Sequence, residues 1–358
     1  MIQFITKRII YGFFVLAGVV TVVFLLFNVL PGDPARMLMG QRADAESLRI
    51  IQKDLGLDQP LSKQFVMYIN DLSPISVHDS DPDHYLYLDE EKYDYTELFS
   101  YGASNVAVIK YPYLRRSYGT KRKVTETLMD YMLETAVLAF AAIIIASLFG
   151  ILFGVLSALN KDSFLDRSLL FTSVLGMSVP SFYSAIIFSW FFGYVISDIT
   201  GLNMTGSLFV YDDLGNGEMV MLSNLILPAL TLGIRPISAI MQLTRSSMLD
   251  VMSQDYIRTA SAKGLKFRTV VIKHALKNAL NPVVTTISGM FASLLAGALF
   301  VEWIFGWKGI GWVLFDALTK FDLPIVMGGV LLTATIFVVI NIVVDITYGL
   351  LDPRVRVK

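Results

Sequence analysis

Few side chains in this 358-residue sequence are of types that could do covalent chemistry. It has no cysteine, and its three histidines (His78, His84 and His274) show no HExxH or other metal-ligand spacing. It also contains no GxxxxGK[ST] phosphate-binding loop, so we do not expect the chain to bind ATP by itself. We therefore predict no catalytic residue, no cofactor and no metal site, and we seek its function in its charged residues.

The most unusual polar stretch is DYIRTASAKGLKFRTVVIKHALKNALNP, residues 255–282, which carries six Lys or Arg residues between two apolar segments. Two short helices are predicted here, and Gly264 is a natural helix stop between them. Their expected bounds are Ser246–Lys263 and Lys266–Leu280, with Pro282 beginning the next helix. Attraction to anionic lipid explains the lysines. It does not explain the small-residue run TASAKG, which lets another protein approach closely.

Three further charged residues lie in or beside apolar runs. Arg235 directly precedes Pro236, and such charges usually face a cavity or another helix. A contact with a substrate carboxylate is one interpretation, but a structural contact or snorkelling near the inner interface is favoured. Glu302 lies at the outer end of a run, where a gate or rim role is open and plain solvent exposure is favoured. Asp345 is interpreted as a helix-end contact.

The composition defines the class of protein. Hydrophobic residues make up 54% of the chain and charged residues only 16%, whereas a soluble domain carries about 25% charge. Because open backbone cannot face lipid, we predict an all-α integral membrane protein. Six runs reach the roughly 20 residues that a transmembrane helix needs. They are Ile9–Leu30, Glu134–Ser157, Ser168–Ile196, Leu222–Leu243, Val283–Phe305 and Pro324–Leu350. Gly150 and Gly154 predict close helix packing, and Pro180 predicts a kink.

The distribution of charge predicts the orientation. Residues 197–221 contain four acidic residues and no Lys or Arg, whereas residues 244–282 contain seven Lys or Arg. The positive-inside rule then places 244–282 and both termini in the cytoplasm. The expected organisation is a first helix (1–30), a long external segment (31–133), a five-helix core (134–350) containing the loop 244–282, and a cytoplasmic tail (351–358).

The external segment is expected to carry helices at Asp44–Leu55 and Leu61–Leu72. Residues 73–113 have the character of an insertion. Within it, residues 79–99 hold eight carboxylates and four tyrosines. A docking face or a cation site is one interpretation of this stretch, and a solvated insertion is the favoured one.

Several stretches together resemble one known family. DYIRTASAKG followed by HALKNALNP resembles the cytoplasmic EAA loop of ABC importer permeases, in the form of the dipeptide, oligopeptide and nickel permease family. Arg258 stands where the general motif has Glu, as is typical of the peptide branch. The resemblance extends along most of the chain. It includes KRIIYGFFVLAGVVTVVFLLFNVLPGDPA, GALFVEWIFGWKGIGWVLFDAL and VDITYGLLDPRVRVK.

The resemblance implies a transport subunit without an ATPase site, in a bacterial plasma (inner) membrane. Its implied partners are a second homologous permease, two cytoplasmic ATP-binding subunits and an external substrate-binding protein, besides membrane lipid and no nucleic acid. The implied coupling residues are Asp255, Arg258, Thr259, Ala260, Ala262, Lys263 and Gly264, and Arg235 and Glu302 are candidate pathway residues. Peptides are the expected cargo. Nickel or another small solute is the alternative, and a secondary transporter is less favoured because no inverted repeat is evident.

Overall fold

The computed structural model describes residues 2–29, 58–82, 84–90, 92–102, 104–211 and 217–351. The chain forms two compact units. The first comprises Met1–Ile10, Tyr131–Trp312 and Ile336–Lys358, and the second comprises Tyr11–Asp130 and Val313–Thr335. The helix predicted at Asp44–Leu55 lies outside the described residues.

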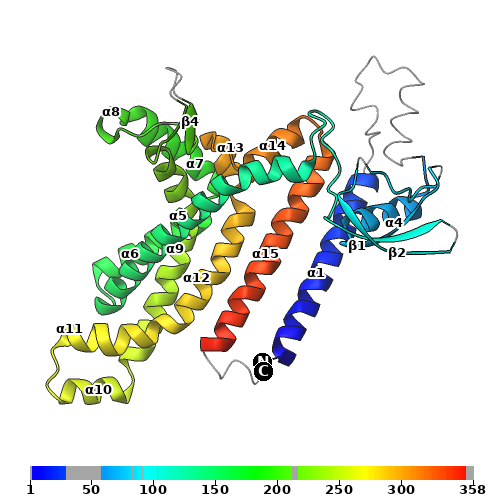
Figure 1. The fold of residues 1–358 in the computed structure, drawn as a ribbon. Helices are drawn as coiled ribbons and strands as arrows, with labels where there is room; N and C mark the ends of the chain where they lie inside the picture. The colour runs from blue at the N-terminus through cyan, green and yellow to red at the C-terminus, as the bar shows by residue number, and fades with distance from the viewer. Residues whose placement is uncertain are drawn as a thin grey trace. The chain divides into compact units, whose positions relative to one another are not determined.

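Within the described residues, four helices are long and apolar enough to cross a membrane, which confirms the predicted all-α membrane class. They are α1 (Ile2–Val29), α5 (Val124–Leu159), α9 (Ser223–Met252) and α15 (Leu323–Leu351), shown in Figure 1. Two pairs of bent helices bring the number of spans to six if each pair crosses once. Both α5 and α9 run well beyond their predicted spans, because a helix need not end where the hydrocarbon ends.

The predicted third span is a bent pair of helices. α6 (Phe164–Ser178) and α7 (Ser181–Trp190), which continues into a π-helical turn η2 (Phe191–Val195), meet at 107°. Pro180 lies at the break, and Val179 before it is extended, as the residue before a proline prefers. The single kinked helix predicted over Ser168–Ile196 is therefore wrong, because the break is much sharper than a kink.

The predicted fifth span is also divided. Ala298 separates α12 (Lys277–Gly297) from α13 (Leu299–Phe305). A further helix that we did not predict, α14 (Ile310–Thr319), follows within the connection to α15. A tight turn follows α13, where Gly306 has a φ of 65°.

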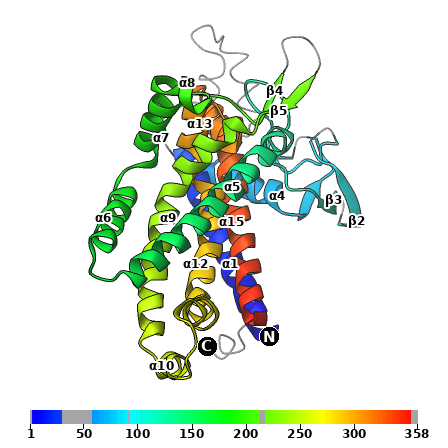
Figure 2. The same cartoon turned by 90° about the vertical axis from the view of Figure 1, so that its left-hand side faces the viewer.

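Small residues allow α5 and α9 to pack closely, as the Gly150–Gly154 spacing predicts (Figure 2). A Cβ added at Gly150 would lie 2.7 Å from the Ile240 Cβ, and one at Gly154 would lie 2.5 Å from the Thr244 Cβ. Each distance is shorter than real side chains tolerate, so larger residues would separate the two helices.

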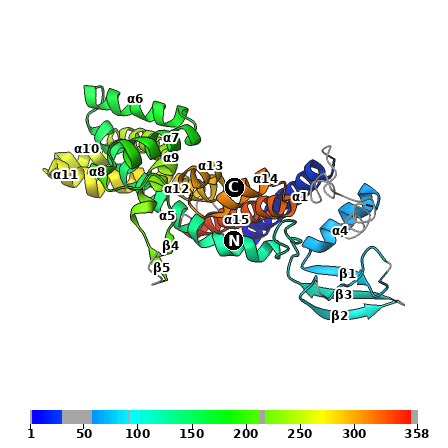
Figure 3. The ribbon, with the colours of Figure 1, turned by 90° about the horizontal axis from the view of Figure 1, so that it is seen from above.

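The second unit contains a small sheet that the sequence did not predict. β1 (Ile75–Asp79), β2 (Tyr95–Tyr101) and β3 (Asn105–Lys110) pair antiparallel in the order β1-β3-β2. Figure 3 shows α4 (Leu61–Leu72) beside β1, and this helix has the predicted bounds. Most of β2 is exposed, whereas Val106, Ala107 and Val108 of the central strand are buried.

The remaining elements are short. They are α8 (Ser197–Thr200), the antiparallel pair β4 (Phe209–Tyr211) and β5 (Glu218–Val220), α10 (Asp255–Ala262), α11 (Phe267–Thr269) and the π-helical η3 (Val270–Leu276).

Candidate functional site

The basic segment between α9 and α12 is helical, but its helices have different bounds from those predicted. α9 continues to Met252, so the first loop helix is the short α10 rather than a helix over Ser246–Lys263. After a turn, α11, η3 and α12 follow without interruption. Pro282 therefore lies inside α12 and does not begin a helix, which corrects the predicted break after Leu280.

Gly264 makes the turn of this loop. Its φ is 75°, in the left-handed region that glycine enters without steric cost. Its N–H donates to the Ser261 carbonyl at 3.0 Å, which closes the end of α10. No heavy atom lies within 4 Å of a Cβ built at Gly264. The backbone conformation, and not a lack of space, is therefore what requires glycine at this position.

The inner face of α10 packs on η3 and the end of α9. Ile257 and Ala260 are buried in a cluster that also contains Met248, Val270 and Ala275. The small-residue run TASAKG predicts that Ala260 lies at the surface and leaves room for a protein partner. Only 8% of Ala260 is exposed, so its small side chain allows α10 to approach η3 instead.

The outer face of the loop carries the other predicted coupling residues. Asp255, Arg258, Thr259, Ala262, Lys263 and Gly264 are all exposed. The Arg258–Asp255 ion pair, at 3.3 Å, lies in solvent and contributes little to stability. The loop also exposes Leu265 and Phe267, which were not predicted, whereas the partly exposed Tyr256 accepts a hydrogen bond from Asn278 of α12. Aromatic residues in a strongly polar loop were the available signal, because apolar anchors within a polar rim are typical of protein interfaces.

A buried ion pair and its hydrogen bonds join the ends of α5, α6 and α9. Arg245 of α9 donates from Nε and Nη2 to the two carboxylate oxygens of Asp166, each at 2.7 Å. Asp166 also accepts from the Ser157 hydroxyl and, at 2.9 Å, from the Asp162 N–H. Its side chain is only 2% exposed. Because a paired arginine fork fixes direction as well as distance, the ends of α5, α6 and α9 are held as one rigid support.

Glu302 is fully buried, so the solvent exposure favoured from the sequence is wrong. Its carboxylate accepts from the Thr135 hydroxyl at 2.8 Å and from the N–H groups of Gly311 and Trp312 at 2.7 and 3.2 Å. A Cβ at Gly309 would lie 2.3 Å from the Glu302 Oε2, so only glycine allows this turn to close over the carboxylate. Glu302 thus ties the turn after α13 to α5.

Glu134, which precedes Thr135 on α5, makes a second set of contacts with distant segments. Glu134 accepts from the Ser207 hydroxyl, and its backbone carbonyl accepts from the Trp307 indole at 3.0 Å. The Ser207 hydroxyl in turn accepts from the Lys308 N–H at 2.9 Å. Sequence reasoning missed this network because its members are separated by 73 to 173 positions.

Of the two other charged residues predicted in or beside the spans, Arg235 lacks a side-chain partner among the described residues and Asp345 has one. Arg235 is exposed on α9, and no side chain among the described residues accepts a hydrogen bond from it. The structure therefore does not bring Arg235 and Glu302 into one site. Asp345 forms an ion pair with Arg8 at 3.1 Å, in keeping with the predicted helix-end contact.

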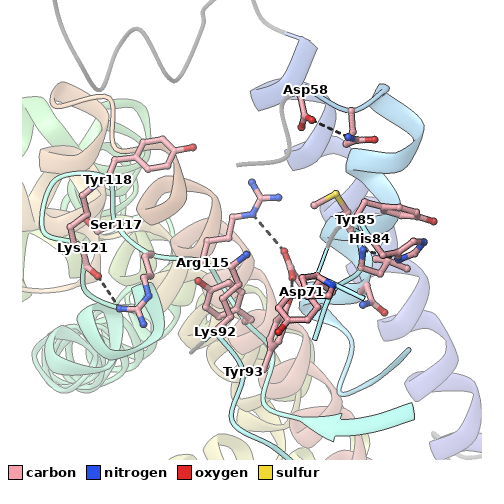
Figure 4. Close-up of a pocket in the computed structure, with 18 residues that line it drawn as sticks. Asp58, Asp71, His84, Tyr85, Lys92, Tyr93, Arg115, Ser117, Tyr118 and Lys121 are labelled. Carbon is pink, nitrogen blue, oxygen red and sulfur yellow. Dashed lines mark hydrogen bonds and ion pairs between the residues drawn. The ribbon is translucent and has the colours of Figure 1, made fainter. Parts of the chain in front are cut away.

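The second unit has a cavity of about 530 Å³ lined by charged and aromatic side chains, shown in Figure 4. Asp71 organises its wall: it accepts from the Tyr93 hydroxyl at 2.7 Å, and the Arg115 Nε lies 3.7 Å from its carboxylate. The Lys110 ammonium donates to the Asp71 carbonyl at 2.6 Å, and burial lowers the pKa of Lys110 to about 8. Tyr93 from the acidic, tyrosine-rich stretch is therefore a packing residue of this unit.

With several apolar helices and an exposed basic loop, the chain has the features of a multi-pass transport component. The family model described as "Binding-protein-dependent transport system inner membrane component" matches residues 150–357, and its N-terminal companion matches residues 1–79. The chain belongs to this family. A component of such a system works with a substrate-binding protein and an ATPase.

Relatives cover the whole chain. It is 34% identical to the di/tripeptide transport system permease protein DppB of Pseudomonas aeruginosa, over 99% of both chains. It is 33% identical to the dipeptide transport system permease protein DppB of Escherichia coli and 34% identical to the glutathione transport system permease protein GsiC of Salmonella typhimurium, each over the full length of both chains.

Proposed function

We propose that this chain is a permease subunit of an ATP-driven importer of dipeptides or oligopeptides. It would form the translocation pathway together with a second homologous permease, and two ATP-binding subunits and an external binding protein would complete the transporter. The observation that supports this proposal is the α10 turn, where six of the seven predicted coupling residues, together with Leu265 and Phe267, are exposed above a buried cluster. The names of the full-length relatives support the peptide cargo.

In this proposal the loop transmits motion and does no covalent chemistry. Closure of the ATPases would move α10 and η3 together, because Ile257 and Ala260 join them through a packed core. The Arg245–Asp166 junction would pass this displacement to α5, α6 and α9. The spans would then exchange between inward-open and outward-open states, a two-state equilibrium biased by ATP and by the loaded binding protein.

We assign Arg235 to the pathway. A charged side chain within a span faces water or protein in preference to lipid. Arg235 is exposed on α9 in the single chain, so its partner would come from the second permease or from the substrate. A peptide carboxylate suits a guanidinium group.

The test of function is uptake by the transporter reconstituted in vesicles. We expect uptake of a labelled dipeptide that requires both ATP and the loaded binding protein. A nickel or other small-solute importer would show the same ATP dependence with a different cargo. Uptake driven by an ion gradient without ATP would identify a secondary transporter and overturn the proposal.

We also propose that both termini and the loop 244–282 are cytoplasmic, from the Lys and Arg asymmetry. Since the chain lacks cysteine, single cysteines can report topology. We expect Ser253→Cys to react with an impermeant thiol reagent only after permeabilisation, and Leu222→Cys, which is 65% exposed, to react without it. Labelling of Ser253→Cys in intact cells would refute this orientation.

A further inference from the structure

The second unit contains another cavity, of about 580 Å³, whose lining residues are of two chemical kinds. One wall is apolar and comes from two membrane helices, with Leu16 and Val20 on α1 and Leu331 and Leu332 on α15. The lining also includes four charged residues outside these two helices, here called the charged rim: Lys92, Asp94, Lys123 and Glu126. This volume lies in the range of ordinary small-molecule sites. An apolar wall joined to a charged rim suits an amphipathic ligand.

The apolar wall lies deep within the spans. Leu16 precedes the end of the α1 span at Phe27 by 11 residues, and Thr335 follows the start of the α15 span at Leu323 by 12 residues. At 1.5 Å per residue, both positions lie roughly 16–18 Å along their helices, which is about half of a 30 Å hydrocarbon core. The apolar wall is therefore at the depth of lipid acyl chains.

The charged rim is balanced. The Lys123 ammonium lies 3.1 Å from Asp94, and the Lys92 ammonium lies 3.8 Å from Asp89. Glu126, in the first turn of α5, is exposed and makes no ion pair among the described residues. Two cations and two anions in the lining suit a head group that itself carries both signs. Tyr111, next to the rim, is 82% exposed, as aromatic residues at a membrane–water interface often are.

We propose that this cavity binds one phosphatidylethanolamine molecule. One acyl chain lies along the apolar wall of α1 and α15. The phosphate accepts hydrogen bonds from Lys92 and Lys123, and the primary ammonium donates to Glu126 and Asp94. A trimethylated choline head group cannot make those donations, so the site discriminates between ethanolamine and choline lipids. This proposal is independent of the cargo.

The acyl-chain half of the proposal is tested on the assembled transporter, purified in detergent and mixed with equal amounts of phosphatidylethanolamine and phosphatidylcholine. Retained lipid is counted by native mass spectrometry. We expect wild type to retain about one phosphatidylethanolamine per copy of this chain, and Thr335→Trp, which fills the cavity, to retain about tenfold less. The matched control is Val339→Trp, four residues further along α15 at a 51% exposed position outside the cavity. It should retain lipid like wild type.

The head-group half is tested with Lys123→Gln and Glu126→Gln, which leave the apolar wall intact. We expect each to lose most of the preference for phosphatidylethanolamine over phosphatidylcholine, whereas Lys121→Gln, outside this cavity, keeps it. Equal retention of the two lipids by wild type would overturn the head-group assignment. Retention by Thr335→Trp equal to that of wild type, or no retained lipid in wild type, would overturn the site.

Discussion

Gly264→Asp is expected to abolish the stimulation of ATP hydrolysis by loaded binding protein, while the chain still inserts and assembles. A residue with a Cβ adopts the φ of 75° at a cost of roughly 1 kcal/mol or more. Nothing lies within 4 Å of that Cβ, so the fold tolerates the change. The added carboxylate and the altered turn displace the exposed side chains that follow the turn, Leu265 and Phe267. The measurement is ATPase activity of the reconstituted transporter with and without loaded binding protein.

A matched control is present in the same chain. Gly201 also has a positive φ, of 64°, and also has no heavy atom within 4 Å of a built Cβ, but it lies after α8 and not in the loop. Gly201→Asp should therefore have a similar backbone cost and keep normal stimulation. If Gly264→Asp were stimulated as strongly as wild type, the loop would be only a membrane anchor, and the residue-level case for coupling would fail.

The second large effect concerns Glu302. Replacement by alanine leaves the Thr135 hydroxyl and the N–H groups of Gly311 and Trp312 buried without their acceptor. Each buried group without a partner costs about 1–3 kcal/mol, so we expect a loss of roughly 3 kcal/mol or more. A chain of 358 residues should then melt roughly 4 °C lower. Glu302→Gln should lie between, because its amide oxygen can still accept while its NH₂ group cannot.

Thermal unfolding of the purified transporter, followed by tryptophan fluorescence, measures this loss. Asp316→Asn is the control. Asp316 pairs with Lys320 at 2.7 Å in an exposed i,i+4 arrangement, which contributes only about 0.3–0.5 kcal/mol. A melting temperature of Glu302→Ala equal to that of Asp316→Asn would show that the buried contacts of Glu302 contribute little to stability.

Features that depend on neighbours in the chain were predictable. Runs of apolar residues identify α1, α5, α9 and α15, because crossing lipid requires a long uncharged helix whatever its partners are. The bounds of α4 followed from its amphipathic pattern, and the left-handed turn at Gly264 followed from the steric freedom of glycine. Pro180 indicated where a helix breaks but not how sharply, since the angle depends on what α6 and α7 pack against.

Features that depend on distant segments were decided by the tertiary structure. Glu302 and Thr135 are 167 residues apart, and Arg245 and Asp166 are 79 apart, so no local pattern brings them together. Ala260 looked like part of an open surface because TASAKG is small, but the same small size lets α10 pack against η3. The sheet of the second unit escaped prediction because its exposed strand β2 lacks an apolar alternation. Whether a polar or small residue is buried is determined by the segment that covers it, and that segment is chosen only when the chain folds.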